Sequence, residues 1–241
     1  MRGETFLKLG RVSNLPTVWT NVLAGVTLAG GAIDAKRLGA LLLSCSLFYT
    51  GGMFLNDAFD SEFDAKNRPE RPIPTSRAHV SHVFAAGYGM LSAALIILVL
   101  LRGSNWGTPA CGLLLAFVII YYDAHHKRNP LSPALMGLCR ALIYAVCALA
   151  VSGRVGLPTA LGGLALFLYV IALSAVAKNE DLLQRLNFWP RAFPNAIAVL
   201  IAGISLLDAL IIAGHGSTLY FIFALLGFTL TLFLQRYVAG T

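Results

Sequence analysis

Polar and charged residues gather in one stretch of this apolar chain, from Asn56 to Arg77, which reads NDAFDSEFDAKNRPERPIPTSR. Asn56, Asp60 and Asp64 stand four residues apart, so on a continuing helix they share one face, about 6 Å apart per turn. Like charges on one face repel each other unless a cation lies between them. Carboxylate and carboxamide oxygens are the ligands that Mg²⁺ takes when it also binds phosphates and water. The spacing therefore predicts a magnesium site.

Basic residues follow the acidic ones directly and alternate with prolines. We expect the prolines to end the helix and to hold this basic segment extended, with a bend back toward the acids. A guanidinium group can bind a phosphate through two parallel hydrogen bonds, so arginines and Mg²⁺ together would clamp a diphosphate. The alternative is a charged loop at the membrane surface that only sets orientation. The residues in question are Arg68, Arg71 and Arg77, with Pro69, Pro72 and Pro74 between them.

The composition of the whole chain indicates an integral membrane protein. Of its 241 residues, 57% are hydrophobic and 12% are charged, and the mean hydropathy is +0.74. Apolar runs of roughly 17 to 23 residues are long enough to cross a hydrocarbon core about 30 Å thick. We expect an all-α protein with a single domain over 1–241, in which 1–14 forms an interfacial helix. The predicted spans are 15–33, 38–56, 79–101, 106–122, 133–151, 157–177, 191–213 and 217–235.

The distribution of charge predicts how the chain sits in the membrane. A formal net charge of +7 would suggest nucleic acid in a soluble protein, but here most cations lie in short loops beside apolar runs. Such loops are orientation signals, so we expect no nucleic-acid partner and place the Asn56–Arg77 loop and both termini on the cytoplasmic side. Most acidic residues fall on the same face, which orientation does not require. This face is therefore predicted to bind something charged.

The Asn56–Arg77 stretch resembles the first aspartate-rich motif of the UbiA superfamily of intramembrane prenyltransferases, NDxxDxxxD followed by RPxRP. The match runs from Asn56 to Asp64 and from Arg68 to Ile73. The number of spans and the place of the motif after the second span are similar too, and the resemblance covers nearly the whole chain. The start of the chain is similar to the first helix of that family at Arg11, Asn14, Trp19 and Gly25.

The resemblance implies about eight transmembrane helices around a central lipid-open cavity. It implies Mg²⁺-dependent transfer of an isoprenyl group from an allylic isoprenyl diphosphate to a small aromatic or lipid-like acceptor within the membrane. By the same resemblance, Asn56, Asp60 and Asp64 are catalytic metal ligands. The diphosphate ligands that it implies are Arg11, Asn14, Arg68, Arg71, Arg77 and Lys127.

Two segments depart from the family pattern. In the family's Tyr-and-Lys segment after the fourth span, Lys follows Tyr by four residues, whereas here His126 follows Tyr122 by four and Lys127 by five. Either could face the diphosphate, and we favour Lys127 as a catalytic residue as well. Tyr121 or Tyr122 could cover a carbocation with a ring face, or serve as an aromatic residue of the membrane interface.

The second departure follows the sixth span, where paired acids at DxxxD spacing are expected and absent. Asn179, Glu180 and Asp181 stand there instead. Adjacent helical residues point about 100° apart, so we expect one or two of them to face the metal: Asp181, also catalytic, and then Glu180. The departure leaves open whether a second Mg²⁺ binds. Lys178 or Arg185 could replace part of a metal's charge, and Lys178 could contact the diphosphate.

Two ionisable residues lie within predicted spans. Arg140 is costly inside a membrane, which makes it a candidate for the cavity, where it would bind diphosphate or acceptor. The alternative is a paired structural arginine. Asp208, near the opposite surface, is predicted to be structural.

The expected partners are an isoprenyl diphosphate, an unidentified small acceptor and membrane lipid. The same motif would serve a UbiA-type terpene cyclase, which quenches its cation internally. A non-catalytic lipid binder or transporter is a second alternative, in which Arg140 and Asp208 would be translocation residues. The prenyl chain length, the acceptor, the regiochemistry and the oligomeric state stay open.

Overall fold

The chain folds into a bundle of long α-helices. The computed structural model describes residues 3–102, 105–179, 196–215, 217–238 and 240, and these contain no β-strand. Short 3₁₀ turns, η1 (Val12–Asn14) and η2 (His126–Arg128), precede α2 and follow α6. The helices are α1 (Gly3–Leu9), α2 (Leu15–Ala29), α3 (Ala35–Phe59), α4 (Ser61–Asn67), α5 (Val80–Leu101), α6 (Gly107–His125), α7 (Ser132–Ser152), α8 (Leu157–Lys178), α10 (Ala196–Ala213) and α11 (Thr218–Gln235).

Within the described residues, seven helices are long and apolar enough to cross a membrane, namely α3, α5, α6, α7, α8, α10 and α11. The predicted all-helical, multi-pass membrane fold is therefore confirmed. The first predicted span, 15–33, extends too far, because α2 ends at Ala29 and has 15 residues. Gly30 ends it in the left-handed conformation, with φ 66°, and its N–H bonds to the Thr27 carbonyl. Left-handed backbone is readily adopted by glycine, which makes it a natural helix stop.

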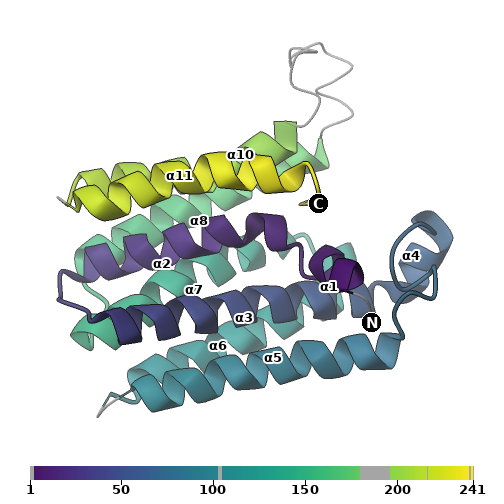
Figure 1. The fold of residues 1–241 in the computed structure, drawn as a ribbon, viewed down its shortest axis with the longest axis horizontal. Coiled ribbons are helices and arrows are strands. Elements are labelled where there is room, and N and C mark those ends of the chain that lie inside the picture. The colour runs from purple at the N-terminus through teal and green to yellow at the C-terminus, as the bar shows by residue number, and fades with distance from the viewer. Residues whose placement is uncertain (1–2, 103–104, 180–195, 216, 239, 241) are drawn as a thin grey trace.

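The long helices run side by side and alternate in direction (Figure 1). As a result, the C-terminal ends of α3, α6, α8 and α11 lie at one end of the bundle, together with α1 and α4. We call this the motif end. It brings the polar residues at the end of α3 close to those at the end of α6: Asn56 and Asp123 are 67 residues apart in the chain and in contact. The folded chain can therefore form one site from both.

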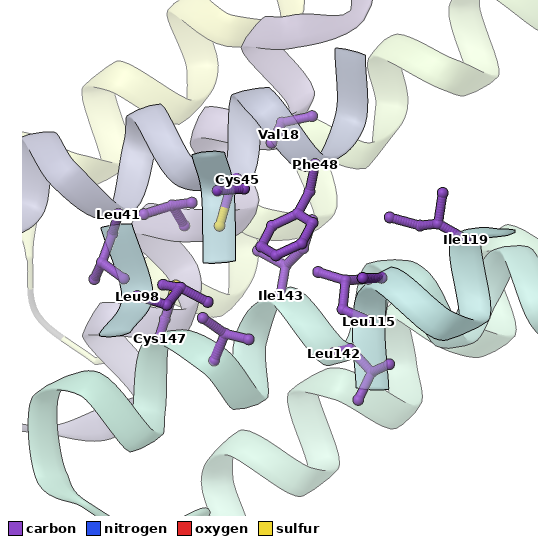
Figure 2. Packing of buried hydrophobic residues seen from close by; sticks show 14 of the residues in the cluster. Val18, Leu41, Cys45, Phe48, Leu98, Leu115, Ile119, Leu142, Ile143 and Cys147 are labelled. Atoms are coloured by element: carbon purple, nitrogen blue, oxygen red, sulfur yellow. The ribbon is translucent and has the colours of Figure 1, made fainter. Parts of the chain in front are cut away.

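The centre of the bundle is a cluster of buried apolar side chains from α2, α3, α5, α6 and α7 (Figure 2). Phe48 of α3 is 1% exposed, and Leu98 and Leu115 from the facing helices are equally buried. Removing such side chains from contact with lipid and water fixes the helices against one another by close packing. The rigid ends of α3 and α6 can therefore hold polar residues in place.

Glycines let α3 and α5 pack closely. A Cβ on Gly51 would lie 3.0 Å from the carbonyl oxygen of Gly87, and a Cβ on Gly87 would lie 2.8 Å from the Leu55 side chain. Either substitution would push the two helices apart. Small residues commonly allow such close approach of helices in membranes. Gly51 lies five residues before Asn56 on α3. The close packing of α3 on α5 therefore holds the part of α3 from which the acidic residues extend.

Candidate active site

The spacing of the acidic residues predicts one continuing helix, but the structure shows a break within it. α3 ends at Phe59 and α4 begins at Ser61, with Asp60 between them. The backbone N–H of Asp60 still bonds to the Asn56 carbonyl at 3.0 Å, and that of Asp64 bonds to the Asp60 carbonyl at 2.8 Å. The four-residue register therefore continues across the break. All three side chains are buried, since Asn56, Asp60 and Asp64 are exposed by 8%, 7% and 2%.

Arginines from two loops neutralise two of the acids. Arg71 donates to Asp64 at 2.9 Å and to Asp57 at 3.2 Å. Arg11 donates to the same oxygen of Asp57 at 3.3 Å, from a left-handed backbone with φ 42° that directs it out of the turn before η1. Arg71, and Arg11 from the start of the chain, thus lie against the acids, with Asp57 as an additional member of the group. That these arginines bind a diphosphate stays a prediction.

Asp60 is held by the segment after α6. Lys127 Nζ lies 2.7 Å from one carboxylate oxygen and His126 Nε2 lies 3.5 Å from the other. The sequence left open which of these two residues faces the site, and both do. Lys127 also lies over the ring of Phe63, 3.8 Å from its centroid.

The charges around Asp60 lower the pKa of its carboxyl group. Burial alone would raise the pKa of Asp60, but the hydrogen bonds and positive charges of His126 and Lys127 outweigh it and hold that pKa below its ordinary value. The bond to Asp60 in turn raises the pKa of His126, against the opposing effect of burial. Asp60 is therefore an ionised carboxylate at neutral pH, as a metal ligand must be.

The basic segment after α4 is not extended, contrary to expectation. It runs through consecutive turns, in which the N–H of Arg71 bonds to the Arg68 carbonyl at 3.1 Å and that of Arg77 bonds to the Pro72 carbonyl at 3.0 Å. Backbone N–H groups of the non-proline residues bond to carbonyls of the same segment, and these bonds hold it in turns. The predicted bend back is present, because the turns return Arg71 to the acids. Arg68 and Arg77 are exposed, and neither side chain has an ion-pair partner within the described parts of the chain.

The last turn of α6 contributes a further acid. Asp123 is 3% exposed, and its Oδ1 accepts from Asn56 Nδ2 at 3.3 Å. Its Oδ2 is buried with no hydrogen-bond partner in the described structure. Tyr122 beside it is half-buried and stacks on His126, whereas Tyr121 is 42% exposed and stacks on His125. Of the two tyrosines, Tyr122 is the one positioned at the site.

Asn14 makes structural contacts rather than contacts to the acids. Its amide donates to the Tyr49 hydroxyl at 3.1 Å and to the Gly240 carbonyl at 2.9 Å, and its oxygen accepts from Gln235 at 2.9 Å. These bonds tie η1 to α3 and to the end of α11. A role in binding diphosphate stays a prediction for Asn14, whose hydrogen-bonding groups are already engaged.

Arg140 belongs to a separate group of buried polar residues inside the bundle. It donates to Asn21 at 2.8 Å and lies over the Tyr49 ring, 5.4 Å from its centroid. Asn21 in turn donates to Asp208 at 2.8 Å. Asp208 is fully buried and also accepts from Thr20 at 2.5 Å and from Tyr144. We call Thr20, Asn21, Arg140, Tyr144 and Asp208 the inner polar network.

Some predicted site residues cannot be placed. Glu180, Asp181 and Arg185 lie outside the described residues. Lys178 is the last residue of α8, exposed and at the motif end. Asp57 and Asp123 were not among the site residues predicted from the sequence. Asp57 could have been found because it is part of the aspartate-rich motif, and Asp123 because it is the only acid in the 106–122 span and the residue that follows it. His126 was weighed there only as an alternative to Lys127.

The donor set fits a hard divalent cation. Asp64 and Asp123 each have one buried carboxylate oxygen without a partner in the described structure, which is costly unless a cation binds there. No three His, Cys, Asp or Glu side chains of the described residues converge into a ready metal site. Mg²⁺ does not require three, because it takes one or two carboxylates and completes its shell with phosphate oxygens and water.

The fold and the site define a multi-pass helical membrane protein with an acid- and arginine-rich site at one end of its bundle. A model of the UbiA prenyltransferase family matches residues 17–240, and the chain belongs to this family.

Curated relatives match about half of the chain. A digeranylgeranylglyceryl phosphate synthase of Methanothrix thermoacetophila is 33% identical over 129 residues, which are 53% of this chain and 47% of the relative. A protoheme IX farnesyltransferase of Methylocella silvestris is 30% identical over 160 residues, which are 64% of this chain and 49% of the relative. The chain thus spans about half the length of the curated relatives it matches.

Solved structures show the same fold over nearly the whole chain. One, from work on digeranylgeranylglyceryl phosphate synthase in membranes, superposes with a TM-score of 0.64 at 18% identity and covers 96% of this chain and 86% of its own. A UbiA homolog from Archaeoglobus fulgidus bound to GPP and Mg²⁺ superposes with a TM-score of 0.57 at 15% identity, with the same coverage. At these identities the likeness establishes the fold.

Proposed function

We propose that this protein is a Mg²⁺-dependent prenyltransferase, which moves an isoprenyl group from an allylic isoprenyl diphosphate to a small aromatic or lipid-like acceptor in the membrane. The observation that carries the proposal is the meeting of Asp57, Asp60 and Asp64 with cations from three separate segments at one end of an apolar bundle. The names of the relatives and the GPP and Mg²⁺ bound to the Archaeoglobus fulgidus homolog support it.

In the proposed reaction, the bond between the allylic carbon and the diphosphate oxygen breaks and negative charge grows on the diphosphate. Mg²⁺ held by Asn56, Asp60 and Asp64 would supply positive charge to the diphosphate oxygens when bound. Arg71 and Lys127 already lie beside these acids and would donate to the same leaving group. Fixed cations that face developing negative charge are among the largest contributions to catalysis.

The remaining residues would guide the reaction. The half-buried ring of Tyr122 stacks on His126, and its other face would shield the allylic cation from early capture. The apolar interior excludes water, which would otherwise quench the cation. The acceptor then provides the electron pair for the new bond and loses a proton. Because cations concentrate at the motif end, we place this end and both termini on the cytoplasmic side.

Diphosphate release by the purified protein tests the proposal. Geranyl, farnesyl and geranylgeranyl diphosphates are each supplied with and without Mg²⁺, and with and without a membrane-lipid extract as acceptor source. We expect Mg²⁺-dependent release that is lost in Asp60→Asn. Asp34→Asn is the matched control, because Asp34 is an exposed cap of α3 that asparagine can replace.

The outcomes separate the proposal from its rivals. Release without any acceptor, with a cyclic hydrocarbon as product, would identify a terpene cyclase. Binding of all three diphosphates without release under any condition would identify a non-catalytic lipid binder and overturn the proposal.

A further inference from the structure

We infer that Asp123 of α6 is a ligand of the metal ion, joining Asn56 and Asp60 from outside the aspartate-rich segment. The inference rests on the proposed function, because it concerns the cation of the same site. It adds a ligand from a second membrane-spanning helix, so that the metal would tie α6 to the end of α3.

The first ground is position. Asp123 lies in the last turn of α6 and touches Asn56, the first residue of the acidic series, at 3.3 Å. It stands four residues before Lys127, which contacts Asp60. Asp123 therefore occupies the position that tyrosine takes, relative to lysine, in the family pattern that this segment resembles. The chain has an acid at the site where an aromatic residue is expected.

The second ground is the lack of a protein partner for its charge. Asp123 is 3% exposed, and its Oδ2 has no hydrogen-bond partner within the described residues. The nearby cations are engaged elsewhere, because Arg11 and Arg71 pair with Asp57 and Lys127 pairs with Asp60. A buried carboxylate in this position either loses its charge or receives a cation from outside the protein.

The third ground is ligand chemistry. Mg²⁺ takes few protein ligands, commonly one or two carboxylates, and keeps room for phosphate oxygens. Asn56 with Asp60 and Asp123 would supply a neutral oxygen and two carboxylates, from the end of α3, the residue after it and the last turn of α6. The chain lacks the paired acids expected after its sixth span, so an acid from α6 would supply charge that the usual second motif does not.

The test measures metal binding directly, with Mn²⁺ as the probe. Free Mn²⁺ is followed by its paramagnetic resonance signal during titration of purified wild-type protein, Asp123→Asn, Asp60→Asn and the control Asp34→Asn, with Mg²⁺ as competitor. We expect Asp123→Asn and Asp60→Asn each to weaken Mn²⁺ binding by about tenfold or more, and Asp34→Asn to bind as the wild type does. Without metal, Asp123→Asn should unfold at the same temperature as the wild type or higher, because asparagine can still accept from Asn56 without a buried charge.

A second variant keeps the test decisive if Asp123→Asn does not fold. Asp123→Cys replaces the carboxylate with a thiol, so a ligand at this position should lose affinity for Mn²⁺ and gain affinity for Cd²⁺ relative to the wild type. The wild type contains four free cysteines and provides the Cd²⁺ background. A residue that only packs would change neither affinity.

The failure of this inference and the failure of the proposed function are distinguishable. Weakened binding in Asp60→Asn with wild-type binding in Asp123→Asn would overturn the role of Asp123 and leave the prenyltransferase proposal standing. A lower unfolding temperature of Asp123→Asn with unchanged Mn²⁺ affinity would likewise show a structural residue. No Mn²⁺ binding by the wild type, even with geranyl diphosphate present, would overturn both.

Discussion

Two groups of buried polar residues lie in the same apolar bundle, and they are satisfied in different ways. In the inner polar network, Asp208 receives hydrogen bonds from Thr20, Asn21 and Tyr144, and every one of these residues belongs to a long helix. At the motif end, Asp64 and Asp123 keep unpaired oxygens within the described structure. The cations there come from Arg11, Arg71 and Lys127, which lie in loops or turns.

The difference separates a polar group that stabilises the fold from one that is suited to bind a ligand. Helix residues packed in a bundle cannot easily change partners, and a complete set of hydrogen bonds leaves nothing for a ligand to add. Long side chains on loops can turn from an acid to an incoming phosphate at little cost. Unpaired buried carboxylate oxygens lower the stability of the folded protein, and a bound cation would remove this penalty.

The largest expected effect is on turnover at the motif end. Replacing Asp60 by alanine should lower Mg²⁺-dependent diphosphate release by about 1,000-fold or more, because one group that positions charge on the leaving diphosphate is lost. The unfolding temperature in detergent should change little, since Lys127 is one-third exposed and can turn to water. Full activity in both Asp60→Ala and Asp64→Ala would contradict the assignment of these acids.

The inner polar network should show the reverse pattern. Asp208→Ala leaves the donors of Thr20, Asn21 and Tyr144 without their acceptor and Arg140 without a nearby negative charge. Breaking a buried charged network by removing one partner costs roughly 3–5 kcal/mol. We expect a large fall in the unfolding temperature, measured in detergent beside Asp34→Asn. An unfolding temperature equal to that of the wild type would remove the basis of the comparison.

The sequence predicted the fold and several residues of the motif end, but not the contacts of the inner polar network. Apolar runs gave the long helices to within a few residues, because hydrophobic length is read directly from the chain. Motif spacing gave Asn56, Asp60, Asp64 and Arg71. It did not give the break at Asp60, since backbone bonds across the break keep the helical register. Likewise, the proline-rich segment folds into turns where an extended chain was expected.

Contacts between helices were the part that sequence could not supply. Asp123 meets Asn56 only because α3 and α6 pack in one particular register, and their residues are far apart in the chain. Asp208 was expected to be structural near the opposite surface, but its partners on α2 and α7 were not foreseeable. Such pairings depend on how residues such as Gly51, Phe48 and Leu115 pack together, which no local pattern encodes.

An intermediate effect is expected at Arg71, which bridges two acids of the motif end. Arg71 reaches both acids through the single nitrogen Nη1. Arg71→Lys keeps the charge but cannot hold a phosphate by the two parallel bonds of a guanidinium fork. We expect about a tenfold rise in KM for the isoprenyl diphosphate, with little change in the unfolding temperature. Arg68→Lys is the matched variant, because Arg68 lies in the same segment and is exposed. An unchanged KM in Arg71→Lys would show that the segment contributes only its total charge, and an equal rise in both variants would show that Arg71 has no special place in it.

The smallest expected effect is the loss of one hydrogen bond from the inner polar network. Thr20→Val keeps the shape of the side chain and removes its donor to Asp208, together with a longer contact to Ser205 at 3.3 Å, while Asn21 and Tyr144 continue to donate. One such bond contributes about 1 kcal/mol, and the loss should appear in the unfolding temperature with KM and kcat unchanged. Thr27→Val is the control on the same helix, because Thr27 donates only to the Leu23 carbonyl of its own helix. If Thr20→Val instead lowered turnover at unchanged stability, the inner polar network would belong to the reaction site, and the division between the two groups would be wrong.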